Sequence, residues 1–310
     1  MPSTIVILGT GGTIAGTATD PNDNVGYTAG QRKVAELLAA VPALAGSNLE
    51  AEQVAQLDSK DMDYATWQRL AQCVAKNLAR PEVGGVVITH GTDTLEETAW
   101  FLQRVLAPTK PVVLVAAMRP STALAADGPQ NLLDAVAVAR TPGARGVLVV
   151  LAGRVHIAGD VRKVRPYRLD AFDSGDAGVL GVVEEGQLRR FREWPASEAL
   201  GMGLLDGDTA NWPWVEIVVS HAGVRGDAVR ALSAAGVKGL VVAATGNGTI
   251  HQTLQLALDE AVAAGIPVWR CTRCNGGVLV GADVGPAAAM SPWQARTELL
   301  LILLAARSVS

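Results

Sequence analysis

The segment from Gly9 to Gly16 constrains the fold of this chain more than any other. It reads Gly-Thr-Gly-Gly-Thr-Ile-Ala-Gly and directly follows an apolar run at residues 4–8. We predict a buried strand that ends in a glycine-rich turn, because glycine adopts backbone angles that other residues avoid and lets a ligand approach the main chain closely. The arrangement recurs at residues 86–94, where Val-Val-Ile precedes Thr-His-Gly-Thr-Asp-Thr. Two strand ends that deliver hydroxyl groups to one sheet edge favour acyl-transfer chemistry over nucleotide binding.

Apolar runs alternate with helical periods along the chain, and β-branched residues are common in the runs. This alternation predicts an α/β fold with a mostly parallel sheet. In the first half of the chain we expect strands at residues 4–10, 52–57, 84–90, 111–115 and 147–151, and helices at residues 31–40, 64–79, 95–106 and 130–139. Ligands of such sheets bind at the carboxyl ends of the strands, where both threonine motifs fall.

The pattern becomes irregular near residue 184, where glycine and proline interrupt a polar stretch. We therefore expect a larger N-terminal catalytic α/β domain over residues 1–190, a linker over 191–212, and a smaller C-terminal α/β domain over 213–310. Strands of the smaller domain are expected at residues 215–220, 239–243 and 267–270, and helices at 228–235, 253–263 and 292–307.

The composition excludes several classes of protein. Hydrophobic residues make up 49% of the 310 residues, which supports a sizeable core and argues against disorder. The net charge is −4 and no basic block is present, so nucleic acid is not the expected partner. The most apolar run, residues 299–306, is far shorter than the roughly 20 residues that cross a bilayer. Since an apolar strand follows Met1 almost at once, we expect no secretory leader, no membrane association and a cytoplasmic location.

Cysteine and histidine give no sign of a metal site. The chain has three cysteines, Cys73, Cys271 and Cys274, and an odd count argues against a disulfide framework. Cys271 and Cys274 form one Cys-x-x-Cys pair, but no further cysteine or histidine lies close by in sequence to complete a zinc site. We read them as free thiols, and we expect neither a metal nor a cofactor.

Thr13 and Tyr27 are candidates for a nucleophile and its partner. A threonine hydroxyl is a poor nucleophile at neutral pH and needs a base, while backbone N–H groups of a glycine turn are suited to stabilising an oxyanion. The alternative for Thr13 is a simple turn hydrogen bond. Tyr27 follows a polar stretch rich in turn-forming residues, so it is placed on a mobile loop that closes over a substrate. The alternative is a tyrosine packed at the base of that loop.

Three further residues, His90, Asp93 and Lys163, each have two interpretations. Asp93 either holds a substrate ammonium or caps the helix that starts near residue 94. His90 is better interpreted as a hydrogen-bonded core or turn histidine than as a catalyst. Lys163, in Gly-Asp-Val-Arg-Lys, is either part of a solvated cationic face or a lysine desolvated in a cleft, where it acts as a base.

Taken together, the motifs resemble the bacterial-type L-asparaginase and glutaminase-asparaginase family. The matching segments run in family order over nearly the whole chain, and so many ordered motifs do not arise readily by chance. They are Gly9-Thr10-Gly11-Gly12-Thr13-Ile14-Ala15, Asp58-Ser59-Lys60-Asp61-Met62, His90-Gly91-Thr92-Asp93-Thr94-Leu95-Glu96-Glu97-Thr98, Met118-Arg119-Pro120-Ser121-Thr122 with Ala126-Asp127-Gly128-Pro129, Gly159-Asp160-Val161-Arg162-Lys163, and Gly246-Asn247-Gly248.

The resemblance implies a hydrolase that converts L-asparagine to L-aspartate and ammonia through an acyl-enzyme. It assigns Thr13 as the nucleophile, with Tyr27 as its partner on a lid. Thr92, Asp93 and Lys163 form a second catalytic cluster, and Thr92 and Asp93 also contact the substrate, the aspartate through its α-amino group. Ser59 holds the substrate α-carboxylate. The family also implies a homo-oligomer, a dimer or a tetramer built from intimate dimers.

Two departures from the family pattern bear on substrate binding. The family usually has glutamine at the position of Lys60, and we expect Lys60 to contact the substrate carboxylate as a point charge; pairing with a nearby acid is the alternative. The chain is also shortened between Cys271 and Met290, where many relatives carry an acidic loop that reaches the neighbouring subunit's site. Asp283 is the acidic residue nearest this position, and Thr249 replaces the final asparagine of an Asn-Gly-Asn motif.

Other functions are weighed against the leading one. A glutaminase-asparaginase of broader specificity is the next candidate, because L-glutamine differs by one methylene and a pocket separates such pairs by only about 1–3 kcal/mol. A catalytically silent amino-acid-binding relative is a further alternative. A nucleotide-binding module is disfavoured, because Gly9 and Gly11 are followed by Ile14 where the Gly-x-Gly-x-x-Gly motif has its third glycine.

Overall fold

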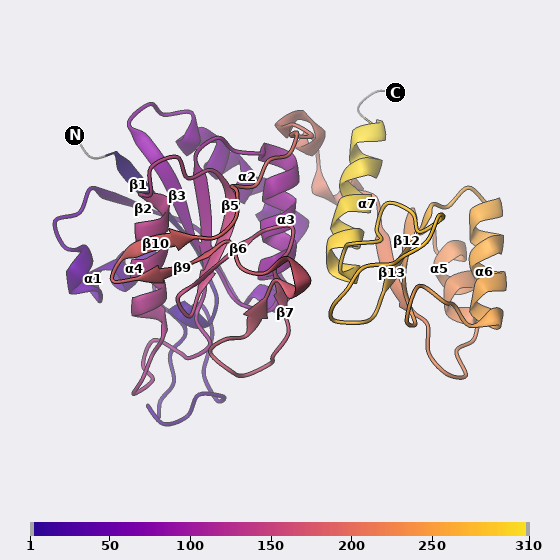
Figure 1. Ribbon diagram of the computed structural model, residues 1–310, viewed down its shortest axis with the longest axis horizontal. Helices are drawn as coiled ribbons and strands as arrows, with labels where there is room; N and C mark the ends of the chain where they lie inside the picture. The colour runs from indigo at the N-terminus through magenta and orange to yellow at the C-terminus, as the bar shows by residue number, and fades with distance from the viewer. Residues whose placement is uncertain (1–2, 308–310) are drawn as a thin grey trace. The chain divides into compact units, whose positions relative to one another are not determined.

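A computed structural model of the protein describes residues 3–307. The chain divides into two compact units, one ending at Met202 and the other beginning at Gly203 (Figure 1). Each unit has its own sheet. Within the described part of the chain, no helix combines the length and the apolarity that crossing a membrane requires.

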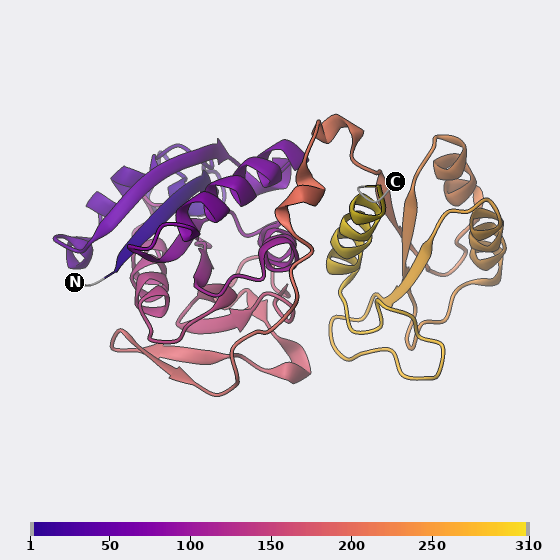
Figure 2. The same cartoon turned by 90° about the horizontal axis from the view of Figure 1, so that it is seen from above.

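An eight-stranded sheet with the order β10-β9-β6-β5-β4-β3-β1-β2 organises the first unit. Its strands β1 to β5 pair in parallel, whereas β6, β9 and β10 pair antiparallel. Figure 2 shows β1 and β2 at one edge of this twisted sheet and the β9–β10 hairpin at the other. The strands are β1 (Thr4–Gly11), β2 (Leu49–Leu57), β3 (Val83–Thr89), β4 (Pro111–Val115), β5 (Gly146–Leu151), β6 (Arg154–Ile157), β9 (Gly181–Glu184) and β10 (Gln187–Arg190), and a separate two-stranded sheet pairs β7 (Arg162–Lys163) with β8 (Phe172–Asp173).

Helices cover both faces of the parallel part of this sheet (Figure 1). Alternate residues of β1 point to opposite faces, and Ile5 and Ile7 pack with Val34 and Leu132 in one buried cluster. Such burial on both faces explains why the strands read as continuous apolar runs. One face carries α1 (Val34–Ala39) and α4 (Gly128–Ala139), and the other carries α2 (Tyr64–Leu78) and α3 (Leu95–Leu106).

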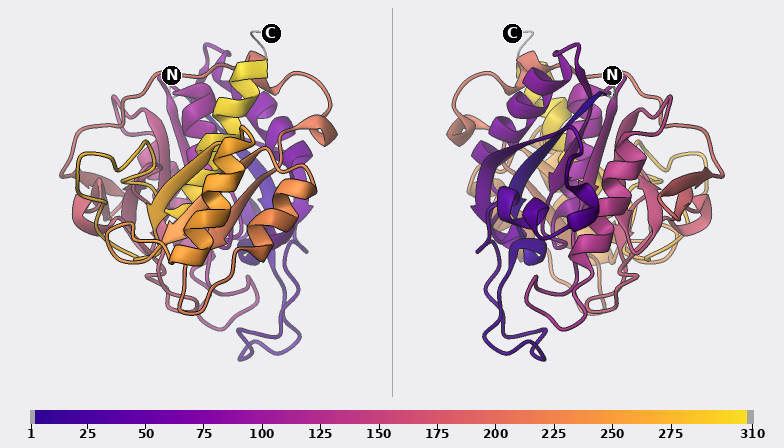
Figure 3. Two further views of the ribbon diagram at one scale, coloured as in Figure 1. Left: turned by 90° about the vertical axis from the view of Figure 1, so that its right-hand side faces the viewer. Right: turned by 90° about the vertical axis from the view of Figure 1, so that its left-hand side faces the viewer.

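The second unit is a three-stranded parallel sheet with the order β11-β12-β13. Its α5 and α6 share a buried cluster with Val218 and Val242 on one face. The last helix, α7, packs on the other face, where Leu299 lies close to Gly239 (Figure 3, left panel). The elements are β11 (Val215–Val219), α5 (Asp227–Ala234), β12 (Gly239–Ala244), α6 (Gln252–Ala263), β13 (Val268–Thr272) and α7 (Pro292–Arg307).

The α/β class and the mostly parallel sheet are as predicted, and each expected helix and strand is present with small shifts at its ends. One shift has a clear cause: α1 begins at Val34 rather than near residue 31, because the amides of Gln31 and Arg32 both donate to Ala15 O. The strands from β6 to β10 were not predicted. The stretch that looked irregular from residue 184 still contains β10, which pairs with β9 across a tight turn at Glu185 and Gly186.

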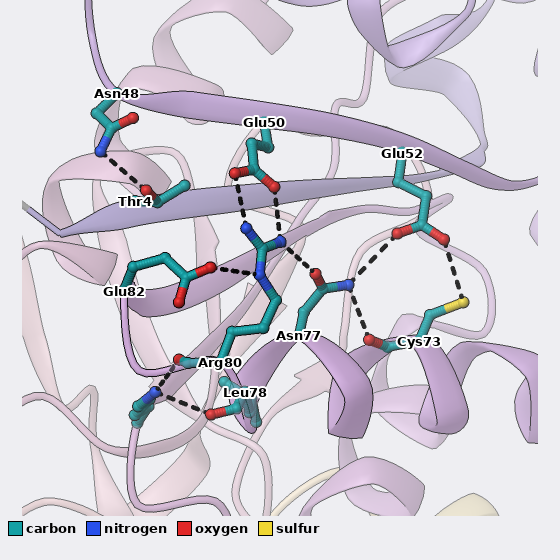
Figure 4. Close-up of polar contacts among 10 residues, drawn as sticks. Thr4, Asn48, Glu50, Glu52, Cys73, Asn77, Leu78, Arg80 and Glu82 are labelled. Atoms are coloured by element: carbon teal, nitrogen blue, oxygen red, sulfur yellow. Dashed lines mark hydrogen bonds and ion pairs between the residues drawn. The ribbon is translucent and has the colours of Figure 1, made fainter.

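A polar cluster ties the edge strand β2 to the end of α2 (Figure 4). Arg80 donates to both carboxylate oxygens of Glu50 at 2.6 and 2.8 Å and to Glu82 at 2.9 Å. Asn77 donates to Glu52 at 3.4 Å and accepts a fourth bond from Arg80 at 3.1 Å. These contacts hold an edge strand whose carboxyl end, at Leu57, lies beside the glycine turn after β1.

A buried chain of hydrogen bonds fixes the segment after β3. His90 Nδ1 lies 2.7 Å from Gly91 O, which accepts only, so Nδ1 carries the proton. Nε2 then accepts from Thr98 Oγ1 at 3.0 Å, and Thr98 accepts from Trp67 Nε1 at 2.9 Å. Burial lowers the pKa of His90 to about 4, which keeps the ring neutral. His90 is therefore a hydrogen-bonded core histidine, as predicted, and it anchors the turn that carries Thr92.

We expect Thr98→Val to lower the free energy of unfolding by about 1–3 kcal/mol, because the shape is kept while two buried polar groups lose their partner. Urea denaturation at neutral pH measures the loss. Thr141→Val, at a partly exposed threonine that bonds within its own helix end, is the matched control. Equal losses in the two variants would contradict this account.

Candidate active site

Three neighbouring strands deliver their carboxyl ends to the same place. The β1, β2 and β3 strands are adjacent in the sheet, and the amide of Gly12 donates to Leu57 O at 2.8 Å. Gly12 has a φ of 79°, and a Cβ built on it would overlap the backbone of Gly91. A Cβ on Gly91 would in turn overlap Ser59 Oγ. The two glycine turns therefore touch, and only residues without a side chain fit at both positions.

Thr13 and Tyr27 form the first cluster. Thr13 begins a single 3-10 turn directly after β1 and is 7% exposed. Its Oγ1 lies 2.6 Å from the Tyr27 hydroxyl, a short contact in which either oxygen can donate. The amide of Gly12 is already donated to Leu57, so that group is not an oxyanion donor. The structure thus brings together the two residues that the sequence singled out as nucleophile and lid partner.

The loop that carries Tyr27 extends beyond the strand ends as the indigo segment of Figure 3. Its base is closed by two backbone bonds of 3.0 Å between Thr17 and Thr28. A second loop supports it: Ser121 donates from Oγ to Gly16 O at 2.7 Å, and Thr122 Oγ1 accepts from Ala18 N at 2.8 Å. These contacts hold the loop in a position that puts the Tyr27 phenol on Thr13.

Thr92, Asp93 and Lys163 form the second cluster. Lys163 Nζ donates to Thr92 Oγ1 at 2.8 Å and to Asp93 Oδ1 at 2.5 Å. The lysine side chain is 18% exposed and paired with Asp93, so it is not part of a solvated cationic face; its action as a base remains a prediction. Helix α3 has Thr94 at its N-cap position, and the alternative of Asp93 as the cap is therefore wrong. Because the lysine occupies an acceptor site of Thr92, the threonine keeps its own O–H proton to donate.

Ser59 lies between the clusters and the end of β2. It is 1% exposed, and its Oγ accepts from the Asp93 amide at 3.1 Å while its carbonyl accepts from Thr94 Oγ1 at 2.8 Å. A serine hydroxyl that accepts a backbone bond still has its own proton to donate. Ser59 is thus fixed in place with a donor available for an anionic group.

Lys60, which we expected to contact the substrate carboxylate, makes ion pairs with two neighbouring acids in the structure. Its ammonium pairs with Asp58 at 3.0 Å and Asp61 at 2.9 Å, and its side chain is 59% exposed. Hydrogen bonds to Asp61 and Asp58 raise the pKa of Lys60, so the amine stays charged. The structure therefore shows the alternative interpretation of Lys60, in which it pairs with nearby acids. A contact between Lys60 and a substrate remains a prediction.

Glu96 was not singled out from the sequence. It lies in the first turn of α3, is 5% exposed, and its Oε2 accepts from the backbone amide of Lys163 at 2.7 Å. Burial raises the pKa of Glu96 to about 7, with the bond to Lys163 acting in the opposite direction. The only signal in the sequence was an acidic residue near a helix start, which ordinary helix capping explains equally well.

No metal site is apparent within residues 3–307, where no three histidine, cysteine, aspartate or glutamate side chains gather as ligands. A cavity of about 980 Å³ lies along α4 and the β9–β10 turn, and its described lining includes Asp134 and Glu185 rather than either hydroxyl cluster. The hydroxyl clusters lie elsewhere, where the carboxyl ends of β1, β2 and β3 converge.

In the second unit, the segment between Cys271 and Met290, where the chain departs from the family pattern, is held by local hydrogen bonds. Asn247 donates to Val280 O and accepts from Val280 N, both at 2.8 Å. Asp283 accepts from Arg270 through its backbone carbonyl at 2.6 Å. Cys271 is buried and Cys274 is exposed, and neither forms a disulfide.

A buried threonine beside a phenol, a lysine–carboxylate pair and a donor for an anion are the parts of an amidohydrolase site that handles a small charged molecule. Family comparison agrees. The model for the N-terminal part of asparaginase matches residues 4–196, and the model for the glutaminase/asparaginase C-terminal domain matches residues 214–309. The chain belongs to the asparaginase family.

Individual relatives are similar over most of their length. A glutaminase-asparaginase of Pseudomonas fluorescens biotype A is 40% identical over 280 residues, which cover 89% of this chain and 77% of the relative. L-asparaginase 2 of Bacillus subtilis (strain 168) is 36% identical over 308 residues, 96% of this chain and 82% of the relative. The crystal structure of a probable cytoplasmic L-asparaginase from Campylobacter jejuni has a TM-score of 0.91 at 38% identity and covers 97% of this chain and 95% of its own.

We expect Gly12→Ala to destabilise the protein by about 1–3 kcal/mol beyond the backbone strain of a positive φ, because its Cβ forces the two turns apart. Gly46→Ala is the matched control: Gly46 has a φ of 73°, and a Cβ added there would have no other atom within 4 Å. Guanidinium unfolding compares the two. A loss in Gly12→Ala no larger than in Gly46→Ala would contradict the close approach.

Proposed function

We propose that this protein hydrolyses the side-chain amide of L-asparagine to L-aspartate and ammonia, with Thr13 as nucleophile. The observation that carries the proposal is the 2.6 Å contact between Thr13 Oγ1 and the Tyr27 hydroxyl, beside the cluster built on Lys163. Relatives named L-asparaginase and glutaminase-asparaginase, at 36–40% identity, support the same reaction.

The chemistry follows from the hydrogen bonds. As Thr13 Oγ1 attacks the amide carbon, its proton moves to the Tyr27 oxygen and the phenol passes its own proton on toward the amide nitrogen, so that a tetrahedral intermediate forms and Tyr27 stays neutral. Collapse releases ammonia and leaves an ester on Thr13. Water then attacks the ester, which releases aspartate and restores the hydroxyl. Thr92, with Lys163 and Asp93, supplies the proton transfers on the other side of the amide.

The ends of the substrate have complementary partners. Asp93, whose carboxylate is half-exposed, is suited to the α-ammonium, and Ser59 to the α-carboxylate. Lys60 adds a positive charge near Ser59, provided that it leaves Asp58 or Asp61 when substrate binds. The two charged groups of the substrate are then each held by the protein, which orients the side-chain amide toward Thr13. This orientation lowers the entropy cost of the reaction.

A glutaminase-asparaginase of broader specificity is the second candidate. One relative of that name is 40% identical, and a methylene separates the two substrates weakly. If Thr13 is not activated, the protein is expected to bind the amino acid without hydrolysing it.

The larger organisation is also proposed. We infer a catalytic domain over residues 1–190, a linker over 191–212 and a smaller domain over 213–310, supported by family matches to residues 4–196 and 214–309. We also propose a homo-oligomer, a dimer or a tetramer, that acts in the cytoplasm and needs no cofactor. One solved relative is described as a probable cytoplasmic L-asparaginase.

Release of ammonia from L-asparagine and L-glutamine by the purified protein tests the function. We expect asparagine to be the better substrate, and Thr13→Ala to lower kcat by at least about 1,000-fold because the nucleophile is lost. Thr13→Ser, which keeps a hydroxyl, serves as the control and should retain measurable turnover. Equal rates for both substrates favour the broader enzyme. Binding of asparagine without ammonia release by the folded wild type would overturn the proposed reaction.

Lys60→Ala tests the proposed carboxylate contact. We expect KM for L-asparagine to rise while kcat changes little, because the lost charge acts on binding rather than on the amide. Asp61→Asn frees Lys60 from one acid and is expected to lower KM. An unchanged KM in Lys60→Ala would show that the lysine serves only its acidic neighbours.

A further inference from the structure

We propose that Glu96 is a positioning residue that sets the place of Lys163 in the second cluster. The inference rests on the proposed function, because positioning matters only if Lys163 takes part in the reaction. Glu96 lies on the same segment as the partners of the lysine side chain and accepts the Lys163 backbone amide at 2.7 Å.

Lys163 is held at both ends by one stretch of chain. Its ammonium donates to Thr92 and Asp93, directly after β3, while its backbone amide donates to Glu96 one helical turn later. A lysine has four rotatable side-chain bonds, so fixing the ammonium alone leaves the backbone free to shift. The second attachment removes that freedom.

The strand that carries Lys163 has little other support. β7 comprises only Arg162 and Lys163, and it pairs with the two-residue strand β8 rather than with the eight-stranded sheet. A two-residue ladder supplies few hydrogen bonds. The bond from the Lys163 amide to Glu96 is therefore the attachment of the β7 backbone to the segment that follows β3, in addition to the bonds of the Lys163 ammonium.

Burying a carboxylate costs free energy unless the charged group is hydrogen-bonded or paired. Glu96 is 5% exposed, and burial disfavours its charged form. When ionised it makes a charge-assisted bond, which is about twice as strong as a neutral one. The charged groups that face it are Glu97 on its own helix and Arg162 and Lys163 on β7. With a pKa raised to about 7, Glu96 makes the strong bond only above neutral pH.

Kinetics of Glu96→Gln and Glu96→Ala test the proposal, with Asp134→Asn as the control. Asp134 is likewise a buried acid with a raised pKa, on α4, with Gln130 as its side-chain partner. We expect Glu96→Ala to lower kcat about 10- to 100-fold with KM within about threefold, because a misplaced catalytic group slows chemistry rather than binding. Glu96→Gln keeps an acceptor and should retain more activity than Glu96→Ala, and the control should match wild type.

The pH profile separates positioning from simple structural damage. Wild-type kcat is expected to fall as the pH is lowered through about 7, because protonation of Glu96 weakens its bond to Lys163. Glu96→Gln carries no such proton and should lose this limb of the profile. A limb that persists unchanged in Glu96→Gln would overturn the role of its charge.

A readout that needs no turnover keeps this inference distinct from the proposed function. The rate at which a water-soluble acylating reagent modifies Lys163, followed by peptide mass spectrometry, reports how firmly the amine is held. We expect faster modification in Glu96→Ala than in wild type and no change in Asp134→Asn. If wild type released no ammonia, the proposed reaction would fail while this comparison still decided the positioning. Equal modification of Lys163 in folded Glu96→Ala and wild type would overturn the inference.

Discussion

The contact between Gly12 and Gly91 is the constraint on which the rest of the site depends. Parallel strands β1 and β3 lie side by side, so their carboxyl ends meet at one sheet edge, but side chains in the following turns would keep the two segments apart. With glycine at both positions the backbones touch. The turn that carries Thr13 and the turn that carries Thr92 then face one small space, and Ser59 fills the gap beside them.

Around this contact the protein builds two clusters by different means. The first joins a rigid strand end to a long loop, because Thr13 is buried while Tyr27 comes from a segment fastened by Ser121 and Thr122. The second is made of fixed parts, in which Lys163 reaches Thr92 and Asp93 from a separate two-stranded sheet. The loop side is the one that is held by a few partly buried hydrogen bonds rather than by a strand of the sheet.

The sequence predicted the parallel sheet well because its strands are buried on both faces and read as apolar runs. It missed β10, whose residues Gln-Leu-Arg-Arg are largely exposed at a sheet edge and show no apolar pattern. In the candidate site, the glycine–threonine turns singled out Thr13 and Thr92 for a role in catalysis, and the structure places both turns where the carboxyl ends of neighbouring strands meet. Glu96 was missed because its partner is a backbone amide 67 residues away, a contact that leaves no trace in local spacing. Lys60 looked like a substrate contact, yet Asp58 and Asp61 hold it.

The most direct test of the account is to look for the covalent intermediate. Protein mixed with L-asparagine and quenched in acid within the first turnover can be digested and analysed by mass spectrometry. The account predicts an aspartyl ester on the peptide that contains Thr13, located on that residue by fragmentation, and its absence in Thr13→Ala. An ester on Thr92, or turnover with no ester on either threonine, would contradict the assignment of Thr13 as nucleophile.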